Sequence, residues 1–531
     1  HQMKDMDRLV EILAQKIRKQ VHIRIIGDYD VDGVTSSHLF LTALRRVGAK
    51  VDVVIPHRIQ DGYGLSLHLL QQAKEDGVDT ILTCDNGIAA IDEIAWAKAQ
   101  KMTVLVTDHH AVPFEEHEGR RTEKKSLADA VVNPHQQDCG YPYKELCGAG
   151  VAWNVIRVLY ENYDMDKREA EDLLDFVAMA TVCDVMSLTG ENRILVKEGL
   201  KRIRHTKNIG LQALMQACNV QPENISAYHF GYVLGPCVNA TGRLDTARHA
   251  LRLFETGQET EAEEIARDLV DLNQERKELT LQGVEMAKKL CEEGGYENDP
   301  VLVLFLPDVH ESIAGLIAGR IREMYNRPVF VLTRGEEGVK GSGRSTENYS
   351  MYENMCGCAE LFTKFGGHPM AAGLSLPEEN VEKFRRKINE NCPLTVEEVC
   401  PDIHIDMAMP VGYASTELVH QFALLEPFGK DNPSPLFADR NLSISRMWVI
   451  GKNRNVLRMS VLSEYGQPVP VIFFGDVETL FAYFTEKFGQ KEVENALHGR
   501  KNRILFSMVY TAKIDFYQGN ENLQLEMKYY R

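Results

Sequence analysis

The sequence predicts an α/β chain with a parallel-sheet domain first, a smaller α/β domain reached through a long helix, and a small β-barrel at the C-terminal end. Three observations support this fold class. Apolar strand-like runs alternate with amphipathic helical patterns up to residue 133, an order that favours a parallel sheet. A long charged stretch without proline then leads into a second α/β pattern. After residue 400, β-type runs separated by turn residues predominate.

In the first domain the predicted strands are short and apolar, at residues 23–27, 51–55, 80–84, 103–107 and 130–133. Amphipathic helices are predicted at 35–47 and 66–76. The charged segment 115–126 is predicted to be a solvated loop. From residue 153 to about 255 the pattern is helical throughout.

The segment 256–293 is predicted to be one long helix, because its early acidic and later basic residues match the helix macrodipole. The second α/β unit has predicted strands at 301–306 and 328–332 and helices at 312–325 and 378–391. Glycine-rich segments lie at 340–345 and 366–373. We therefore divide the chain into a first domain at 1–255, a connecting helix at 256–295, a second domain at 296–398 and a barrel at 399–531.

Composition narrows the class of protein. The 531 residues carry a net charge of −17, from 60 basic and 77 acidic residues, which argues against bulk attraction to nucleic acid or an anionic membrane. Metals and a local basic groove can still supply such attraction. Eleven cysteines without a CxxC pair predict a reducing compartment and no structural zinc. No apolar stretch reaches the roughly 20 residues that span a bilayer. We expect a cytoplasmic protein without membrane contact.

Acidic residues and histidines follow three of the predicted strands. They are Asp28, Asp30, Asp32, Asp85, Asp108, His109 and His110. Because the carboxyl ends of parallel strands meet at one edge of the sheet, these side chains are expected to converge. So many carboxylates repel one another unless cations neutralise them. The sequence therefore predicts a site for two divalent metals.

Residue chemistry also indicates which metals. A set of carboxylates and imidazole suits Mn²⁺ better than Ca²⁺, with Mg²⁺ as the alternative. Asp184 ends an apolar helical run and could reach the site from the helical layer. The simpler interpretation is that one aspartate at a strand end caps a helix, and that Asp184 caps or pairs. Three such clusters at one edge favour the metal site.

Four short motifs resemble those of the DHH phosphoesterases: DYDVDG at 28–33, TCDNG at 83–87, TDHH at 107–110 and ATVCD at 180–184. GGHPMAAG at 366–373 resembles the signature of the DHH-associated substrate domain. The segments 58–65, 239–243 and 425–437 resemble one branch, the single-stranded-DNA-specific exonucleases. That branch ends in an oligonucleotide-binding (OB) barrel, so the resemblance spans nearly the whole chain.

The resemblance implies roles for the matched positions. The implied metal ligands are Asp30, Asp32, Asp85, His109 and Asp184, with Asp85 bridging. Asp28 and Asp108 would ligate or orient, and His110 would contact the scissile phosphate and stabilise its developing charge. Two positions depart from the family pattern. Ile26 stands where other branches carry a ligating histidine, so that Asp28 would substitute. Cys237 stands where the family usually has arginine, which predicts an altered phosphate or DNA contact.

Candidate substrate contacts follow. The backbone amides of a glycine-rich stretch can approach a phosphate closely, although a plain tight turn explains the stretch as well. Its residues are Gly366, Gly367, His368, Ala371 and Gly373. Arg344 is expected to add a bidentate phosphate contact, and the resemblance adds Asn239 and Arg243. His310 and Arg320 are weaker candidates, which a core histidine and a surface arginine also explain.

In the barrel, Arg454 and Arg458 lie near Trp448 in a locally basic segment. Basic residues beside aromatic ones are typical of single-strand-binding barrels, and a solvated basic face is the alternative. The expected function is that of a Mn²⁺- or Mg²⁺-dependent exodeoxyribonuclease that degrades single-stranded DNA from the 5′ end in repair and recombination. The polarity is implied by the resemblance alone. A monomer that works with a helicase or a single-strand-binding protein is expected.

Two alternatives stay open. One is a relative that cleaves short oligoribonucleotides or cyclic dinucleotides, which would not need the extra barrel. The other is a non-catalytic DNA-binding scaffold, which would be expected to lose its metal ligands, whereas the matched carboxylates and both histidines are intact.

Overall fold

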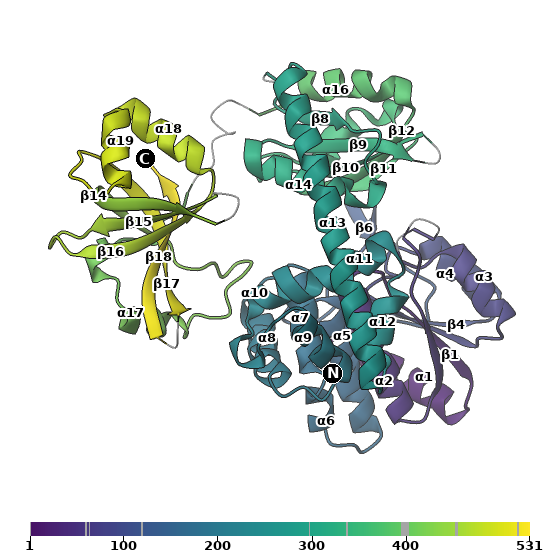
Figure 1. Cartoon of the computed structure of the whole chain (residues 1–531). Coiled ribbons are helices and arrows are strands. Elements are labelled where there is room, and N and C mark those ends of the chain that lie inside the picture. Colours follow the sequence, from purple (N-terminus) through teal and green to yellow (C-terminus); the bar gives the residue numbers. More distant parts are fainter. Residues whose placement is uncertain are drawn as a thin grey trace. The chain divides into compact units, whose positions relative to one another are not determined.

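The computed structural model of the chain describes residues 2–58, 61–62, 64–117, 120–296, 298–335, 338–394, 403–451, 455–517 and 520–531. Contacts divide the chain into two compact units, residues 1–401 and 402–531, which are treated separately below (Figure 1). The finer limits at residues 255 and 295 remain predictions. Among the described helices, none has the combination of length and apolar character that crossing a membrane requires.

The first sheet is parallel and has the strand order β2-β1-β3-β4-β7. Its strands are β1 (His22–Ile26), β2 (Lys50–Val54), β3 (Thr80–Cys84), β4 (Thr103–Thr107) and β7 (Ala130–Val132). The helices that alternate with them are α1 (Met6–Arg18), α2 (Val31–Arg46), α3 (Leu67–Glu75) and α4 (Ile91–Ala99). The predicted parallel sheet is confirmed.

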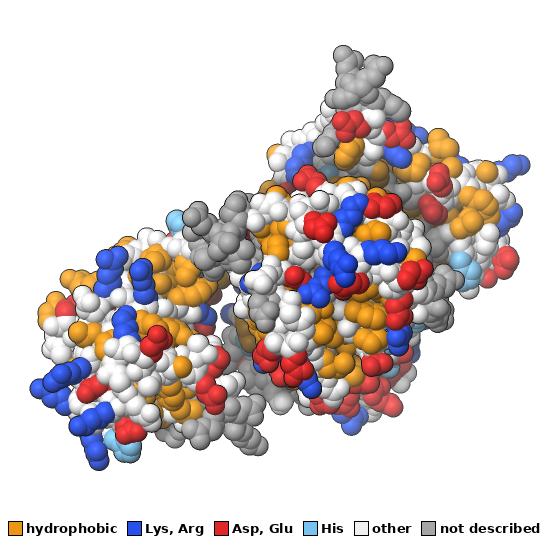
Figure 2. Space-filling view, turned by 90° about the horizontal axis from the view of Figure 1, so that it is seen from above, with side chains coloured by type: hydrophobic (Ala, Val, Ile, Leu, Met, Phe, Trp, Pro, Cys, Tyr) orange, Lys and Arg blue, Asp and Glu red, His pale blue; other side chains and the backbone are white. Residues whose placement is uncertain are grey.

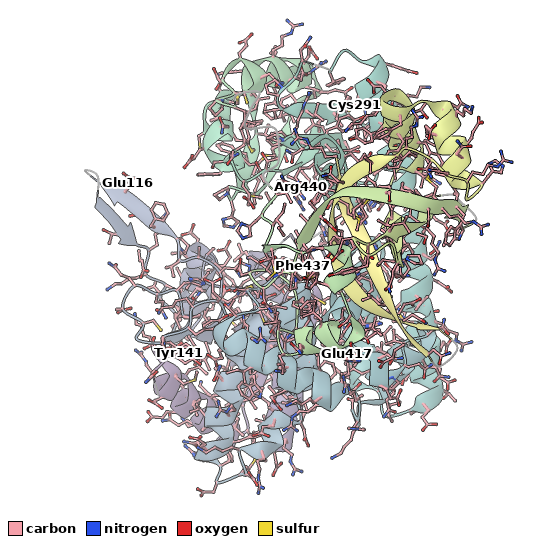
Figure 3. The ribbon with its side chains drawn as sticks, turned by 90° about the vertical axis from the view of Figure 1, so that its left-hand side faces the viewer. Glu116, Tyr141, Cys291, Glu417, Phe437 and Arg440 are labelled. Atoms are coloured by element: carbon pink, nitrogen blue, oxygen red, sulfur yellow. The ribbon has the colours of Figure 1, made fainter. Side chains whose placement is uncertain are left out.

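The predicted loop at 115–126 is wrong. The segment contains an antiparallel hairpin of β5 (Phe114–His117) and β6 (Arg120–Glu123). Figure 3 labels Glu116 on this hairpin, which projects from the rest of its unit. Five of the eight residues in its two strands are charged, so the apolar alternation that marks a half-buried strand is missing. Backbone pairing forms the hairpin without that signal.

A helical layer follows the sheet, as predicted. It contains α5 (Gly148–Asn162), α6 (Arg168–Glu171), α7 (Leu174–Cys183), α8 (Gly190–Ile203) and α9 (Ile209–Ala217). A continuous helical segment then contains α10 (Ala227–His229), the π-helical η2 (Phe230–Leu234) and α11 (Gly235–Leu244), and α12 (Arg248–Glu255) comes next. The predicted long helix is α13 (Glu259–Glu293), which in Figure 1 runs from this layer to the second sheet.

The second sheet has the order β11-β12-β10-β9-β8, and only β8 and β9 are parallel. Its strands are β8 (Leu302–Phe305), β9 (Val329–Gly335), β10 (Gly338–Arg344), β11 (Lys364–Gly367) and β12 (Ala371–Leu376). The helices are α14 (Glu311–Tyr325), α15 (Met351–Cys356) and α16 (Val381–Glu390). Both glycine-rich segments thus contribute to antiparallel strands.

The C-terminal unit is the predicted barrel, closed because β14 pairs with both β15 and β17. Its strands are β13 (Met407–Ala408), β14 (Phe437–Ile450), β15 (Val456–Leu462), β16 (Pro468–Phe474), β17 (Leu505–Tyr517) and β18 (Asn520–Tyr530). Several strands are longer than expected, and β14 continues through a register shift. The helices α17 (Thr416–Phe422), α18 (Val477–Phe488) and α19 (Gln490–Leu497) were not expected. On the face drawn in Figure 2, acidic and basic side chains are interspersed with apolar ones.

A buried histidine links α2 to the helical layer. His38 is 6% exposed and its ring lies 4.5 Å from that of Phe176 and 5.8 Å from that of Phe254, between centroids. Its Nδ1 is buried without a hydrogen-bond partner among the described residues. Burial, with a smaller effect of Arg45, lowers the pKa of His38 to about 3. The folded protein therefore keeps this imidazole neutral.

Because His38 is buried in its neutral form, we expect the folded protein to lose stability in acid. In the unfolded chain His38 takes up a proton near pH 6.5, whereas in the folded chain it does so only near pH 3. The contribution of neutral His38 to the free energy of unfolding is therefore fully present above pH 6.5. It is lost as the pH falls below that value, by up to about 1.4 kcal/mol per pH unit. We expect His38→Phe to flatten the decline of unfolding free energy between pH 6 and 4, measured by urea unfolding in EDTA. Parallel declines in both proteins would contradict this account.

Candidate metal centre

The first motif turns the chain from β1 into α2. Asp30 caps α2, and its Oδ1 accepts a hydrogen bond from the Gly33 N–H at 3.0 Å. A Cβ on Gly33 would lie 2.4 Å from the carbonyl oxygen of Asp28, so only glycine fits there. The buried Asp28 side chain accepts from the Gly64 N–H at 3.3 Å. Motif 1 thus places two carboxylates at the end of β1.

Asp32 is held by a second helix. Its two oxygens accept hydrogen bonds from the N–H groups of Gly148 (2.6 Å) and Ala149 (2.8 Å), in the first turn of α5. Asp32 already lies in α2, so the three carboxylates of the first motif do not simply alternate along an extended chain. The positive end of α5 compensates the charge of Asp32.

Asp85 and His109 lie at the centre of the site. Asp85 follows β3 in the left-handed region, at φ 61°. The Nε2 atom of His109 lies 3.0 Å from Asp85 Oδ1 and 3.6 Å from both Asp32 Oδ2 and Asp184 Oδ2. The first three motifs therefore meet at one edge of the sheet, as predicted from the strand order, and Asp184 of the fourth reaches them from the end of α7 in the helical layer.

Asp108 orients its neighbours. Its Oδ1 accepts from the backbone N–H groups of His109 (2.7 Å) and His110 (3.0 Å), and its Oδ2 accepts from that of Ile88 (2.8 Å). Asp108 Oδ1 also bonds His110 Nδ1 at 2.8 Å. Burial opposes a charged imidazole, but this bond and the charge of Asp108 outweigh it and raise the pKa of His110 to about 9.

Three groups of side chains bring potential ligand atoms within 4.8 Å of one another. They are Asp85 with His109 and His110, Asp32 with His109 and Asp184, and Asp28 with Asp30 and Asp85. All the predicted metal ligands take part, and Asp108 belongs to none of these groups. Because Asp85 and His109 each occur in two groups, adjacent cations could share them.

Electrostatics show what the arrangement costs without cations. Burial, followed by the charge of Asp30, raises the pKa of Asp28 well above its usual value. Burial, followed by Asp32 and the other neighbouring carboxylates, does the same to the pKa of Asp85. The Oδ1 of Asn86 is also buried without a hydrogen-bond partner among the described residues. Hard divalent cations would neutralise the carboxylates, and water bound to such a cation could donate a hydrogen bond to the Asn86 oxygen. The residues fit the predicted metals.

Arginines form a separate cluster. Arg243 on α11 donates from Nη1 to the Ser312 carbonyl oxygen at 2.6 Å. Burial and the positive charges of Arg58, Arg276 and Arg344 lower the pKa of Arg243 to about 10. Burial and Arg58 also lower the pKa of Arg344. Because these half-buried guanidinium groups repel one another, an anion bound between them would be stabilised. Arg58 was not among the predicted contacts, and its place is decided only by the fold.

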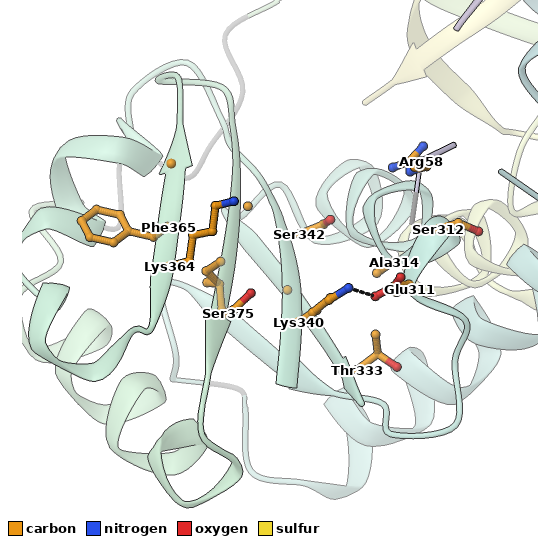
Figure 4. A pocket seen from close by; sticks show the side chains of 14 residues that line it. Arg58, Glu311, Ser312, Ala314, Thr333, Lys340, Ser342, Lys364, Phe365 and Ser375 are labelled. Atoms are coloured by element: carbon orange, nitrogen blue, oxygen red, sulfur yellow. Dashed lines mark ion pairs between the residues drawn. The ribbon is translucent and has the colours of Figure 1, made fainter. Parts of the chain in front are cut away.

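A cavity of about 400 Å³ adjoins this cluster (Figure 4). Arg58 reaches it from the first sheet domain, and the second sheet supplies most of the lining, including Ser342, Lys364 and Gly366. The figure also shows the ion pair between Lys340 and Glu311, which measures 2.8 Å. One cavity therefore combines groups from both sheet domains.

The glycine-rich signature is a hairpin. Gly366 and Gly373 face each other across β11 and β12, and the His368 N–H donates to the Ala371 carbonyl oxygen at 2.8 Å. Gly367 has the φ of 155° that the turn needs. The side chain of His368 is exposed. The tight-turn interpretation is therefore confirmed. Gly366 and Gly373 also line the cavity, and phosphate binding by this segment stays a prediction.

Other predicted contacts have structural partners. Asn239 Oδ1 accepts from the Val31 N–H at 3.2 Å and so ties α11 to motif 1. His310 caps α14 and accepts from the Ser312 N–H at 3.3 Å. Arg320 is exposed and pairs with Glu323 at 3.3 Å. The surface-arginine interpretation therefore matches Arg320, whereas His310 is an exposed helix cap and not a core histidine.

The two departures from the family pattern are both buried. Ile26 is part of the core at the end of β1. The Sγ of Cys237 accepts from Asn273 Nδ2 at 3.4 Å and lies 3.8 Å from Cys218 Sγ. Cys237 therefore contributes to packing between α9, α11 and α13.

In the barrel, Trp448 lies opposite Arg458 across β14 and β15, and the guanidinium of Arg446 lies 5.7 Å from the Trp448 ring centroid. Phe473 belongs to the core, whereas Phe474 is exposed. Arg454 lies outside the described residues.

Comparison with known proteins agrees with this architecture. Family models match at residues 22–181 (DHH family, N-terminal domain), 298–392 (DHHA1 domain) and 405–529 (RecJ OB domain). The single-stranded-DNA-specific exonuclease RecJ of Haemophilus influenzae is 32% identical over 100% of this chain and 91% of its own length. The chain belongs to the RecJ family.

Two further RecJ proteins are similar. The RecJ protein of Bacillus subtilis is 33% identical over 88% of this chain. The match spans only 58% of the length of that relative. The crystal structure of Thermus thermophilus RecJ in complex with Mn²⁺ matches this chain with a TM-score of 0.80 and 26% sequence identity. The match covers 100% of this chain and 72% of the Thermus chain. The predicted domain types and their order are those of RecJ.

Proposed function

We propose that this chain is a metal-dependent exonuclease that hydrolyses single-stranded DNA from the 5′ end. The observation that carries the proposal is the set of buried carboxylates and two histidines that meet at one sheet edge. The names of its RecJ relatives, single-stranded-DNA-specific exonucleases, support the substrate. The Mn²⁺ in the Thermus structure supports the metal. Two cations, preferably Mn²⁺ and alternatively Mg²⁺, would activate water and polarise the phosphate when bound.

The side chains of this chain do the rest. Asp30, Asp32, Asp85, His109 and Asp184 would hold the two ions, with Asp85 between them and Asp28 beside it. The α5 amides keep Asp32 in place. Asp108 fixes the ring of His110 through Nδ1, so that Nε2 would donate to a non-bridging oxygen of the scissile phosphate.

The substrate would be held beyond this centre. Arg243 and Arg344, joined by Arg58, would bind the phosphate at the 5′ end, because guanidinium groups match phosphate oxygens. Gly366 and Gly373 leave space for the strand beside them. In the barrel, Arg458 and Trp448 would also bind single-stranded DNA. The expected monomeric state, the cytoplasmic location, the helicase or single-strand-binding partner and the role in repair are part of the same proposal.

The proposal is tested with purified chain, Mn²⁺ and three labelled substrates: a 5′-tailed duplex, a 3′-tailed duplex and a dinucleotide. Removal of the 5′ tail alone is the expected result. Cleavage of the dinucleotide with both tails intact would instead indicate a small-substrate phosphodiesterase. Tight binding of the tails without turnover would indicate a scaffold. Degradation of blunt duplex at the same rate would contradict the specificity for single strands.

The arginine cluster predicts dependence on the terminal phosphate. Arg243→Gln is expected to raise the KM for 5′-phosphorylated single strands by about 10- to 100-fold, since one charge-assisted hydrogen bond contributes about 1.5–3 kcal/mol. For a 5′-hydroxyl strand the change should be small. The matched control is Arg320→Gln, an exposed arginine paired with Glu323. Equal effects on both substrates would show that Arg243 does not bind the phosphate.

A further inference from the structure

Two tyrosines form an exposed stacked pair on the first unit. Tyr228 is 62% exposed and Tyr232 is 71% exposed. Their rings are stacked, with centroids 5.1 Å apart and planes at 26°. They are four residues apart in a continuous helical segment, the spacing that places side chains on the same face. Two large aromatic rings that remain in water while stacked on each other indicate a surface that binds something.

The backbone that carries this pair is unusual. Residues Phe230–Leu234 form a π-helix between α10 and α11. π-Helical turns are rare and frequently occur at functional sites. The core side of this turn is provided by Phe230 and Leu234, which are buried. The two tyrosines therefore do not pack into the hydrophobic core of the unit.

The same turn packs against the helix that ends in Asp184. A Cβ on Gly231 would lie 3.5 Å from Val182 Cγ1, and one on Gly235 would lie 2.3 Å from Cys183 Sγ. The Cys183 thiol also bonds the Phe230 carbonyl oxygen, at 3.3 Å. The tyrosine pair thus lies on a segment that is in direct contact with the residues preceding Asp184.

The other end of the helical segment reaches the arginine cluster. Asn239 accepts from the Val31 N–H of motif 1, and Arg243 lies with Arg58 and Arg344. Eleven residues separate Tyr232 from Arg243, or about 16 Å at 1.5 Å per residue. One helical segment therefore runs from the proposed phosphate site, past the metal centre, to the tyrosines.

We propose that Tyr228 and Tyr232 form a stacking platform for nucleobases of the single strand whose 5′ end is held at the metal centre. This inference rests on the proposed function. The occupant is single-stranded nucleic acid because the pair continues the path that begins at the arginines and the carboxylates. Unpaired bases stack on aromatic rings regardless of their identity, whereas the bases of a duplex already stack on one another. The platform would favour single strands over duplexes without reading their sequence.

The test separates bases from backbone. Binding of a 12-nucleotide strand and of an abasic strand of equal length is measured by fluorescence anisotropy in EDTA, so that no turnover occurs. The double variant Tyr228→Ala and Tyr232→Ala is expected to bind the base-bearing strand at least about fivefold more weakly. Its affinity for the abasic strand should be unchanged. Replacement of both tyrosines by Trp should restore binding, because Trp also stacks.

The matched control is Ile194→Ala on α8, where an equally exposed apolar side chain (63%) without a ring is shortened. Equal affinities of the double variant and the wild type for the base-bearing strand would overturn the platform. So would equal weakening for both strands, since that would indicate a backbone or partner contact. If the wild type neither degrades nor binds single strands, the proposed function itself fails. If the wild type degrades single strands and the double variant binds them with unchanged affinity, only the platform is contradicted and the proposed function stands.

Discussion

Asp85→Asn is expected to lower the exonuclease rate by about 10³-fold or more and, in EDTA, to raise the thermal midpoint of the protein. The activity falls because the carboxylate that two ligand groups share is lost, and metal stabilisation of the transition state is worth several kcal/mol. The midpoint rises because Asp85 is buried among Asp32, Asp30, Asp184 and Asp28, whose charges oppose its own. Metal centres are places where folding stability is given up for function.

The measurement compares the variant with the wild type in EDTA and in excess Mn²⁺. A ligand at about 100 times its Kd stabilises the folded state by about 2.7 kcal/mol, so Mn²⁺ should raise the midpoint of the wild type much more than that of the variant. The activity control is Asp175→Asn, since Asp175 is a buried carboxylate that accepts from Thr206 outside the metal cluster. A variant that keeps its activity, or its full response to Mn²⁺, would show that Asp85 is not a ligand.

Gly148→Ala is expected to lower the exonuclease rate by about 100-fold, although Gly148 has no side chain. A Cβ there would lie 2.7 Å from Asp85 Cβ and 3.0 Å from Asp32 Oδ2, so at least one of these carboxylates has to move. A displacement of about 1 Å in a catalytic site can cost about 100-fold in rate. Overpacking of this kind also destabilises by about 1–3 kcal/mol. Single-turnover rates and thermal unfolding in Mn²⁺ measure both effects.

Gly150→Ala is the matched control on the same helix. A Cβ at Gly150 would meet Leu146 Cδ2 at 3.3 Å, the end of a side chain that can shift. Alanine is also the better helix former, by about 1 kcal/mol. This variant should therefore keep its activity and most of its stability. Similar losses in both variants would mean that α5 tolerates no alanine and that the carboxylates are not the cause.

Part of the candidate site could be predicted because its signal is local. Each of β1, β3 and β4 is a largely apolar run followed within two residues by acidic residues. A β-α-β order is enough to bring such strand ends together, whatever the details of packing. The same reasoning does not reach Arg58, which meets Arg243 of α11 only because the helical layer folds against the sheet of the same domain. Nor does it reach Gly148, whose neighbours Asp85 and Asp32 come from distant segments.

The features that the sequence did not reveal have similar causes. The β5–β6 hairpin escaped prediction because its pairing depends on backbone hydrogen bonds, while its charged side chains carry no alternation. Asn239 stays a predicted substrate contact, and the structure adds that its oxygen accepts a hydrogen bond from the Val31 N–H. The polar residue was visible in the sequence, and its partner was not.

The sequence by itself therefore determined the alternation of strands and helices in the first domain, the parallel sheet, the barrel and the edge at which the carboxylates gather. These follow from periodicity and residue type within short windows, which set local structure. The tertiary structure alone decided which arginines share an anion site, which glycines must lack a Cβ and which tyrosines stay exposed. Those features depend on distances between segments far apart in the chain, and packing fixes such distances only when the whole unit has folded.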